Sequence, residues 1–296
     1  MTNEIYGIDY LRRRLADKQT RVLLRYKYYE MKNNAQDFSS LAPEKFKGLK
    51  ETVGWCAKAV DSLADRLQFD EFQNDEFNLS EIFLSNNQDI LIDSAVLSAL
   101  ISACSFVYIR EDNGYPRLQV IDGSNATGII DPVTNLLTEG YAVLERDSMG
   151  VVKTEAYFMA GMTEIYSHGV LVQRIPNAAP YALLVPIIYR PDAKRPFGHS
   201  RISRACIAYT QTALRTIKRS EVSAEFYSFP QKYVLGLSED AEFNNRLATI
   251  SSFLNFTKDG DGDHPIVGQF QQQSMTPYTE PVSYTHLRAH ETLANL

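Results

Sequence analysis

The stretch from Pro180 to Gly236 constrains the fold most strongly, because it joins an apolar strand pattern to an unusually long helix pattern. The turn Gly198-His199-Ser200 follows the strand, and no Gly or Pro interrupts residues 201–228. A helix of that length would measure on the order of 40 Å, whereas an average globular helix has roughly 11–12 residues. Phe229-Pro230 then ends the pattern, because proline has no amide hydrogen to donate. We therefore expect a rod that spans part of the molecule.

The predicted rod has two different faces. An apolar stripe recurs at steps of three and four residues and consists of Ile202, Cys206, Tyr209, Ala213 and Ile217. A polar stripe consists of Arg204, Gln211, Arg215 and Lys218. Between Pro196 and Leu235, six Lys or Arg stand against two Glu, in a chain whose formal net charge is −6. The simplest explanation for the polar stripe alone is a solvated helix face.

The rest of the chain changes from helical to strand periodicity near residue 105. Amphipathic helices are predicted over 8–31, 44–68 and 88–103, and Ser200 is the predicted N-cap of the rod. Short β-branched and aromatic runs separated by turn residues predict antiparallel strands over 106–110, 117–121, 139–146, 151–160, 162–167, 170–175 and 183–189. A further helix is predicted near 239–255. We find no internal repeat and no transmembrane span, and the chain is predicted to be α+β.

Several ordered motifs resemble portal proteins of tailed bacteriophages, of the type found in phages of Gram-positive bacteria. The central ones are Val185-Pro186-Ile187-Ile188, the Gly198-His199-Ser200-Arg201-Ile202 turn and the helix end at 223–231. Similar segments occur elsewhere at 59–67, 90–100, 105–109, 131–134 and 265–270. The resemblance covers most of residues 5–281.

The resemblance implies a domain organisation for the chain. Residues 1–195 would form the wing, helical over 1–104 and strand-rich over 105–195, and residues 196–229 would form the stem helix. Residues 230–281 would form a small clip-like subdomain distant from the wing strands. Residues 282–296 read as a translated sequencing adapter, so we expect an artefactual tail. The chain would then be a truncated portal fold without the second stem helix, the tunnel loop and the crown.

The resemblance also implies a function and a set of partners. Portal subunits form a homo-oligomeric ring, usually a dodecamer, at one capsid vertex of the virion, after assembly in the host bacterial cytoplasm. The ring conducts non-specific double-stranded DNA during packaging and ejection and joins head to tail. Its expected partners are terminase, capsid protein and a head-tail adaptor, and no membrane. Arg204, Gln211, Arg215 and Lys218 are then candidates for facing DNA or a neighbouring subunit.

The charge distribution agrees with a passive conduit. Residues 59–93 carry nine Asp or Glu against one Arg, and residues 236–281 carry seven against two. Such acidic segments repel phosphate, and a channel must not hold DNA tightly, because affinity rises with every neutralised phosphate. The alternatives that stay open are another head-completion or adaptor protein and, with less support, a DNA-processing enzyme.

The motifs that would indicate catalysis or a cofactor are incomplete. Asp259, Asp261 and Asp263 have the spacing of a calcium loop, but His264 and Phe270 occupy positions that require Gly and Glu. His286 and His290 lie in the adapter-like tail. We expect no enzyme activity, no catalytic residue, no metal site and no cofactor. The three cysteines, at 56, 104 and 206, are expected to be buried free thiols in a reducing compartment.

Overall fold

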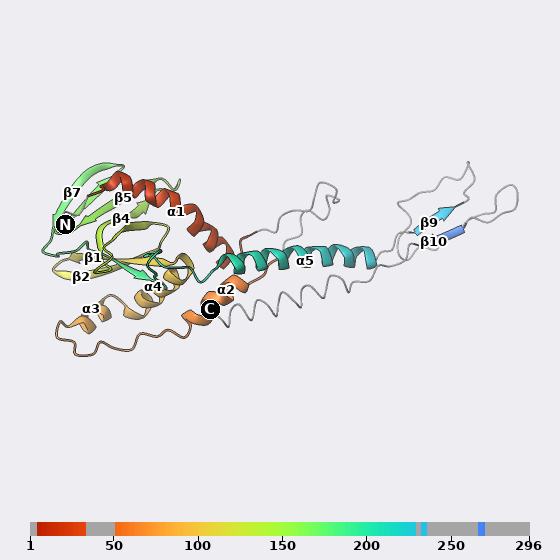
Figure 1. Cartoon of the computed structure of the whole chain (residues 1–296), viewed down its shortest axis with the longest axis horizontal. Coiled ribbons are helices and arrows are strands. Elements are labelled where there is room, and N and C mark those ends of the chain that lie inside the picture. Colours follow the sequence, from red (N-terminus) through yellow and green to blue (C-terminus); the bar gives the residue numbers. More distant parts are fainter. Residues whose placement is uncertain (1–4, 34–50, 229–231, 236–265, 270–296) are drawn as a thin grey trace. The chain divides into compact units, whose positions relative to one another are not determined.

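The computed structural model describes residues 5–33, 51–228, 232–235 and 266–269 (Figure 1). These residues form helices and antiparallel sheets, so the α+β class predicted from the sequence is confirmed. The chain divides into two compact units, unit 1 with residues 1–33 and 52–210 and unit 2 with residues 34–51 and 211–296. The boundary falls inside the longest described helix, α5 (Arg204–Ser228). The predicted wing, residues 1–195, lies largely in unit 1.

Unit 1 contains four further helices: α1 (Ile8–Tyr29), α2 (Trp55–Ala64), α3 (Leu79–Ser85) and α4 (Gln88–Ser102). The helix predicted over 44–68 was too long: of its described residues, 51–54 and 65–68 are not helical. α3 was not expected, since seven residues are too few to show periodicity. Its start is stabilised by Asp75, which accepts hydrogen bonds from the amides of Leu79 and Ser80 at 2.6 and 2.8 Å.

All seven predicted strands are present. The three-stranded sheet has the order β2-β1-β8 and contains β1 (Cys104–Asp112), β2 (Tyr115–Ile121) and β8 (Leu184–Ile188). The five-stranded sheet follows chain order and contains β3 (Ala126–Ile130), β4 (Leu137–Arg146), β5 (Val152–Met159), β6 (Met162–Ser167) and β7 (Val170–Pro176). Of the strands in these two sheets, only β3 was not expected. Its Gly128 approaches β4 so closely that a Cβ would lie 2.5 Å from the carbonyl oxygen of Glu139.

The five-stranded sheet is covered on both faces. One face packs against β1 and β8 through fully buried apolar side chains, including Phe106, Phe158 and Leu184. The other face packs against α1 through Leu11 and Leu15, together with tyrosines of the strands. Figure 1 shows α1 lying along this second face.

A separate apolar cluster joins the helices of unit 1 to the segment before α5. It consists of Tyr28, Cys56, Val60, Leu100, Ile101 and Ile202. The sulfur atoms of Cys56 and Cys206 are 3.4 Å apart. All three cysteines are free, as predicted; Cys56 and Cys104 are buried and Cys206 is half-buried. This cluster links α1, α2 and α4 to the chain entering the long helix.

Within the predicted clip-like segment, residues 230–281, the structure describes β9 (Lys232–Leu235) and β10 (Ile266–Gln269). The two strands pair antiparallel with each other and belong to unit 2. The helix expected near 239–255, the Asp259 to Asp263 run and the adapter-like tail 282–296 lie outside the described residues.

Candidate functional site

The turn before α5 requires glycine at Gly198. Its φ is +71°, a left-handed conformation, and a Cβ there would lie 2.2 Å from the carbonyl oxygen of Tyr189. The same carbonyl accepts a hydrogen bond from the amide of His199 at 2.9 Å. The backbone of the turn therefore lies directly against the end of β8, and any side chain at position 198 would separate them.

The residues after this turn satisfy the C-terminal end of α4. Ser200 Oγ donates to the carbonyl oxygen of Ile101 at 2.6 Å, and the amide of Arg201 donates to that of Leu100 at 2.8 Å. The last carbonyls of a helix lack partners within the helix, so Ser200 and Arg201 supply donors to carbonyl groups that would otherwise be unsatisfied. Arg201 Nε also donates to the carbonyl oxygen of Ala59 in α2, at 3.0 Å. The Gly198 to Arg201 segment thus connects β8, α4 and α2.

Ser203, not Ser200, is the N-cap of α5, which corrects the sequence prediction. Its Oγ accepts a hydrogen bond at 3.1 Å from the amide of Cys206, three residues further along the chain, as an N-cap side chain does. Ser200 accepts only from the amide of Ile202, at 3.0 Å, because its hydroxyl is directed to α4. The helix therefore begins three residues later than the pattern suggested.

The four candidate residues on α5 differ in exposure. Arg204, Gln211 and Arg215 are exposed, whereas Lys218 is 2% exposed. Arg204 belongs to unit 1 and the other three to unit 2. In the apolar stripe, Ile202 and Ala213 are buried and the other members are half-buried. Lys218 is thus buried whereas the other three candidates are exposed, and the assignment of all four to DNA or a neighbouring subunit stays a prediction.

A short motif, Thr-Glu-x-Tyr, occurs in each of three consecutive strands and builds a polar layer beneath α1. Its copies are Thr138-Glu139-Gly140-Tyr141 in β4, Thr154-Glu155-Ala156-Tyr157 in β5 and Thr163-Glu164-Ile165-Tyr166 in β6. The strand register places Tyr141 opposite Tyr157 and Glu155 opposite Tyr166, so the Glu and Tyr side chains share one face. This repeated motif was not recognised in the sequence, because its spacing is irregular and glutamate in a strand suggests an exposed position.

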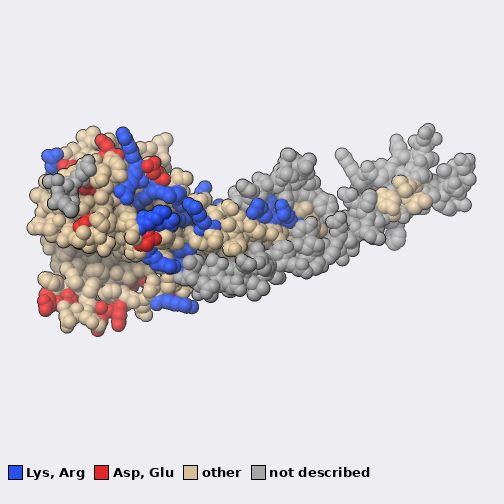
Figure 2. Space-filling view, viewed as in Figure 1, with Lys and Arg blue, Asp and Glu red and all other residues tan. Residues whose placement is uncertain are grey.

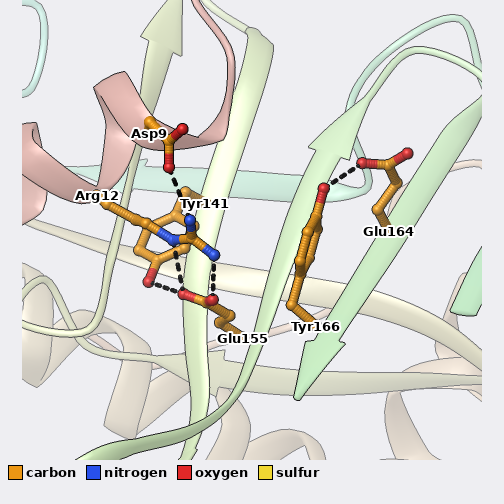
Figure 3. A network of polar contacts seen from close by, with 6 residues as sticks. All are labelled: Asp9, Arg12, Tyr141, Glu155, Glu164 and Tyr166. Atoms are coloured by element: carbon orange, nitrogen blue, oxygen red, sulfur yellow. Dashed lines mark hydrogen bonds and ion pairs between the residues drawn. The ribbon is translucent and has the colours of Figure 1, made fainter. Parts of the chain in front are cut away.

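Arg12 of α1 lies over this layer and binds Glu155 (Figure 3). Its Nε and Nη2 donate to the two carboxylate oxygens, while Tyr141 OH donates to the same carboxylate at 2.5 Å. Asp9 accepts from Arg12 Nη1 at 2.7 Å, and the guanidinium carbon is 5.6 Å from the centre of the Tyr166 ring. The bond to Glu155 is the main reason that the pKa of Arg12 is raised.

Glu139 performs a similar task at the N-terminal end of α1. Its two oxygens accept hydrogen bonds from the amides of Tyr6 and Gly7, at 2.8 and 2.9 Å, and from Tyr157 OH at 2.6 Å. These amides precede the first turn of α1, where negative charge is favoured by the helix dipole. Glu139 and Glu155 therefore fix the position of α1 on the sheet.

The tyrosines of this layer are held in the neutral form. Burial, followed by hydrogen bonding to Glu155 and Glu139 respectively, raises the pKa of Tyr141 and of Tyr157. For the same reasons, with Glu164 as acceptor, the pKa of Tyr166 is raised to about 12. Neutral tyrosines that donate to occupied carboxylates form a positioning network, without an activated nucleophile next to a free base.

One pocket of about 310 Å³ lies beside this layer, at the low end of the range for small-molecule sites. Its walls come from the β3–β4 turn and the ends of β4 and β5, and include Asp131, Thr138, Glu139, Tyr157, Met159 and Tyr181. Glu139 and Tyr157 are already engaged with each other. Glu139 and Tyr157 of this pocket thus serve the attachment of α1.

α1 is strongly basic, and the sequence alone already shows this, although the sequence analysis did not identify α1 as a surface. The helix carries seven Lys or Arg against two Asp. Some of these cations bind backbone carbonyls at the ends of other elements: Lys18 Nζ donates to Ala126 O of β3 at 2.5 Å and Arg25 Nη1 to Ser102 O of α4 at 2.8 Å. Others, including Arg13, Arg21 and Lys27, are exposed, and Figure 2 shows Lys and Arg gathered over α1.

Comparison with known proteins does not assign the chain to a group. No family model matches it, and no curated protein is significantly similar to it. Among the described residues, no cluster of His, Cys, Asp and Glu could hold a metal ion. None of the helices that the structure describes combines the length and the apolar character needed to cross a membrane.

Proposed function

We propose that the chain is a subunit of a phage portal, a ring at the capsid vertex through which double-stranded DNA passes during packaging and ejection. The observation that carries this proposal is the ordered run β8, Gly198 turn, α5 and β9. It contains the motifs of the resemblance in the same order, and α5 has 25 residues. The proposal includes attachment to head and tail proteins and to terminase.

The contacts of the segment before α5 support a structural role for this helix. Hydrogen bonds from Ser200 and Arg201 connect the chain before α5 to α4 and α2, and Gly198 keeps it against β8. A helix that connects two parts of a ring subunit needs such a rigid attachment. An attachment by a flexible linker would not support the proposal.

The separate pairing of β9 with β10 supports a second functional region after the helix. These strands pair with each other, in a different unit from the eight strands of the wing. We propose that this region is the clip, the part of a portal that meets terminase and later an adaptor protein.

The proposal is tested by electron microscopy of the protein encoded by the complete reading frame that contains this chain. A portal gives closed rings with a central hole. Particles without a hole would contradict the proposal and would favour a head-completion or adaptor protein. Divalent-metal-dependent cleavage of DNA by the purified protein would favour an enzyme instead.

A further inference from the structure

Unit 1 has two exposed surfaces of opposite charge, and each also exposes at least one large apolar side chain. The basic surface consists of Arg13, Arg21, Leu24 and Lys27 on α1 together with Arg195, and the exposed Asp17 lies between Arg13 and Arg21 on the same face of α1. The acidic surface consists of Asp70, Glu71, Glu76, Phe77, Leu84, Asp89 and Ile90. α1 and α3 lie on opposite sides of unit 1 in Figure 1, and Figure 2 shows Lys and Arg over α1 and Asp and Glu where α3 and the segment before it lie.

Arg195 belongs to the basic surface because the segment containing it packs against α1. The guanidinium carbon of Arg14 is 5.5 Å from the centre of the Phe197 ring, and Lys18 Nζ is 5.9 Å from it. Burial, then the charge of Arg21 and, less strongly, that of Arg195, lower the pKa of Arg25. Among the described residues, no carboxylate forms an ion pair with Arg21, Lys27 or Arg195; Asp192 binds His199 and accepts from the backbone amide of Arg195 at 2.7 Å. Positive charge therefore accumulates here.

The acidic surface is held together by an aromatic cluster. The rings of Phe69, Phe72 and Phe83 lie 4.8 to 5.9 Å apart, so the segment before α3 packs onto α3. This packing places Asp70 and Glu71 beside α3. Two other side chains of the surface, Phe77 and Leu84, are 78% and 66% exposed.

Exposed apolar side chains among like charges favour a protein partner over DNA. A DNA-binding surface is polar and positively charged throughout, whereas a protein interface has an apolar centre and a charged rim. Leu24 of the basic surface is 45% exposed and Ile90 of the acidic surface is 65% exposed. Each surface thus has the composition of one half of a protein interface, and their charges are complementary.

We infer that the basic surface of one copy of this chain docks onto the acidic surface of a second copy. The two surfaces are different and lie on opposite sides of the unit, so the contact is head to tail, and repeated contacts close into a ring when the rotation permits. This inference deepens the proposed function and rests on it only for the expectation that the ring closes.

The test uses charge reversal on each surface of the whole 296-residue chain. Variant A is Arg21→Glu with Lys27→Glu, and variant B is Glu71→Lys with Glu76→Lys. Self-association is measured by sedimentation velocity over a range of protein and salt concentrations, with circular dichroism as the check on folding. The control, Lys153→Glu with Arg174→Glu, makes the same charge change on β5 and β7, at residues that belong to neither surface and that pair with Glu145 and Glu164.

We expect the unmodified chain and the control to associate, and more weakly at high salt. Variants A and B alone should each associate at least about tenfold more weakly, because like charges then face each other. An equimolar mixture of A and B should recover association, since every contact between alternating copies is again between opposite charges. This recovery cannot arise from variants that simply fail to fold.

Three results would overturn the inference: a monomeric unmodified chain, unchanged association of variant A or B, or no recovery in the mixture. If variant A lost retention of duplex DNA but associated normally, the basic surface would belong to nucleic acid. The proposed function fails separately. Open head-to-tail assemblies that never close would contradict the portal and leave the inference standing. Rings that persist in both variants would support the portal and overturn the inference.

Discussion

The two faces of the five-stranded sheet carry different chemistry although they belong to the same strands. Toward β1 and β8 the sheet presents Ala142, Ala156 and Phe158, all fully buried and without polar atoms in their side chains. Toward α1 the same strands present glutamates and tyrosines, of which Glu139 and Glu155 are each 4% exposed. One face of the sheet thus contributes mainly to its stability, and the opposite face fixes the position of α1.

The difference follows from what each face must specify. An apolar contact is non-directional and tolerates small shifts, whereas a hydrogen bond to a buried carboxylate fixes the position of its donor. Arg12 and the amides of Tyr6 and Gly7 have acceptors at only one placement of α1. We therefore expect losses on the apolar face to be larger in free energy, and losses on the polar face to affect the placement of α1.

The largest effect is expected on the apolar face. Phe158→Ala should lower the free energy of unfolding by about 3–5 kcal/mol, because the side chain is fully buried and its removal leaves a cavity. Urea unfolding followed by circular dichroism measures this loss. A loss below that of the polar-face variants would contradict the division between the two faces.

On the polar face, Glu155→Gln should cost about 2–3 kcal/mol, because the Arg12 guanidinium loses its charged partner. The value is below that for a fully buried pair, since the Arg12 side chain is 31% exposed. Hydrogen exchange should accelerate in α1 more than in β4 and β5. Equal acceleration in all three elements would show that Glu155 supports the sheet and not the position of the helix.

A smaller loss is expected for a single hydroxyl. Tyr141→Phe removes the donor to Glu155 and should lower the free energy of unfolding by about 1 kcal/mol. Tyr115→Phe is the matched control, because Tyr115 OH donates to Glu81 at an exposed position. Urea unfolding should show almost no change for the control, and similar losses for both variants would argue against a special role of the polar layer.

The last effect is a change in how stability depends on pH, and it is seen only in alkali. Because the pKa of Tyr166 is raised from 10.0 to about 12, and those of Tyr141 and Tyr157 are also raised, the unfolded chain loses protons first as pH rises. Their stabilisation is thus complete below about pH 10 and is lost above it. Unfolding free energies measured between about pH 9 and 11 should fall less steeply when all three are Phe. An unchanged slope would contradict this prediction.

The sequence predicted the strands of unit 1 well because each is bounded by turn residues. Asn113-Gly114 and His168-Gly169 lie between strands that pair as hairpins. The helix α3 and the strand β3 were not predicted, since one is very short and the other contains Gly128. Their stability comes from Asp75 and from close packing against β4, and neither contact is visible in local periodicity.

The sites were less predictable than the fold. Ser200 has the residue type of an N-cap, but its hydroxyl bonds to the end of α4, which only tertiary structure brings near. The polar layer depends on the register of β4, β5 and β6, which aligns glutamate and tyrosine from separate strands. The composition of residues 8–29 shows that α1 is basic. Only the tertiary structure shows that the segment containing Arg195 packs against it.

The pairing of β1 with β8 determines the order in which the chain can acquire its structure. Cys104 pairs with Ile188, and all of β2 to β7 lie between them in the sequence. Closing so long a loop costs conformational entropy, and this cost falls when the intervening hairpins have already formed. During synthesis β8 can join β1 only after the five-stranded sheet has left the ribosome. The Gly198 turn lies against the end of β8, so the segment that leads into α5 takes its place only after β8 has joined β1.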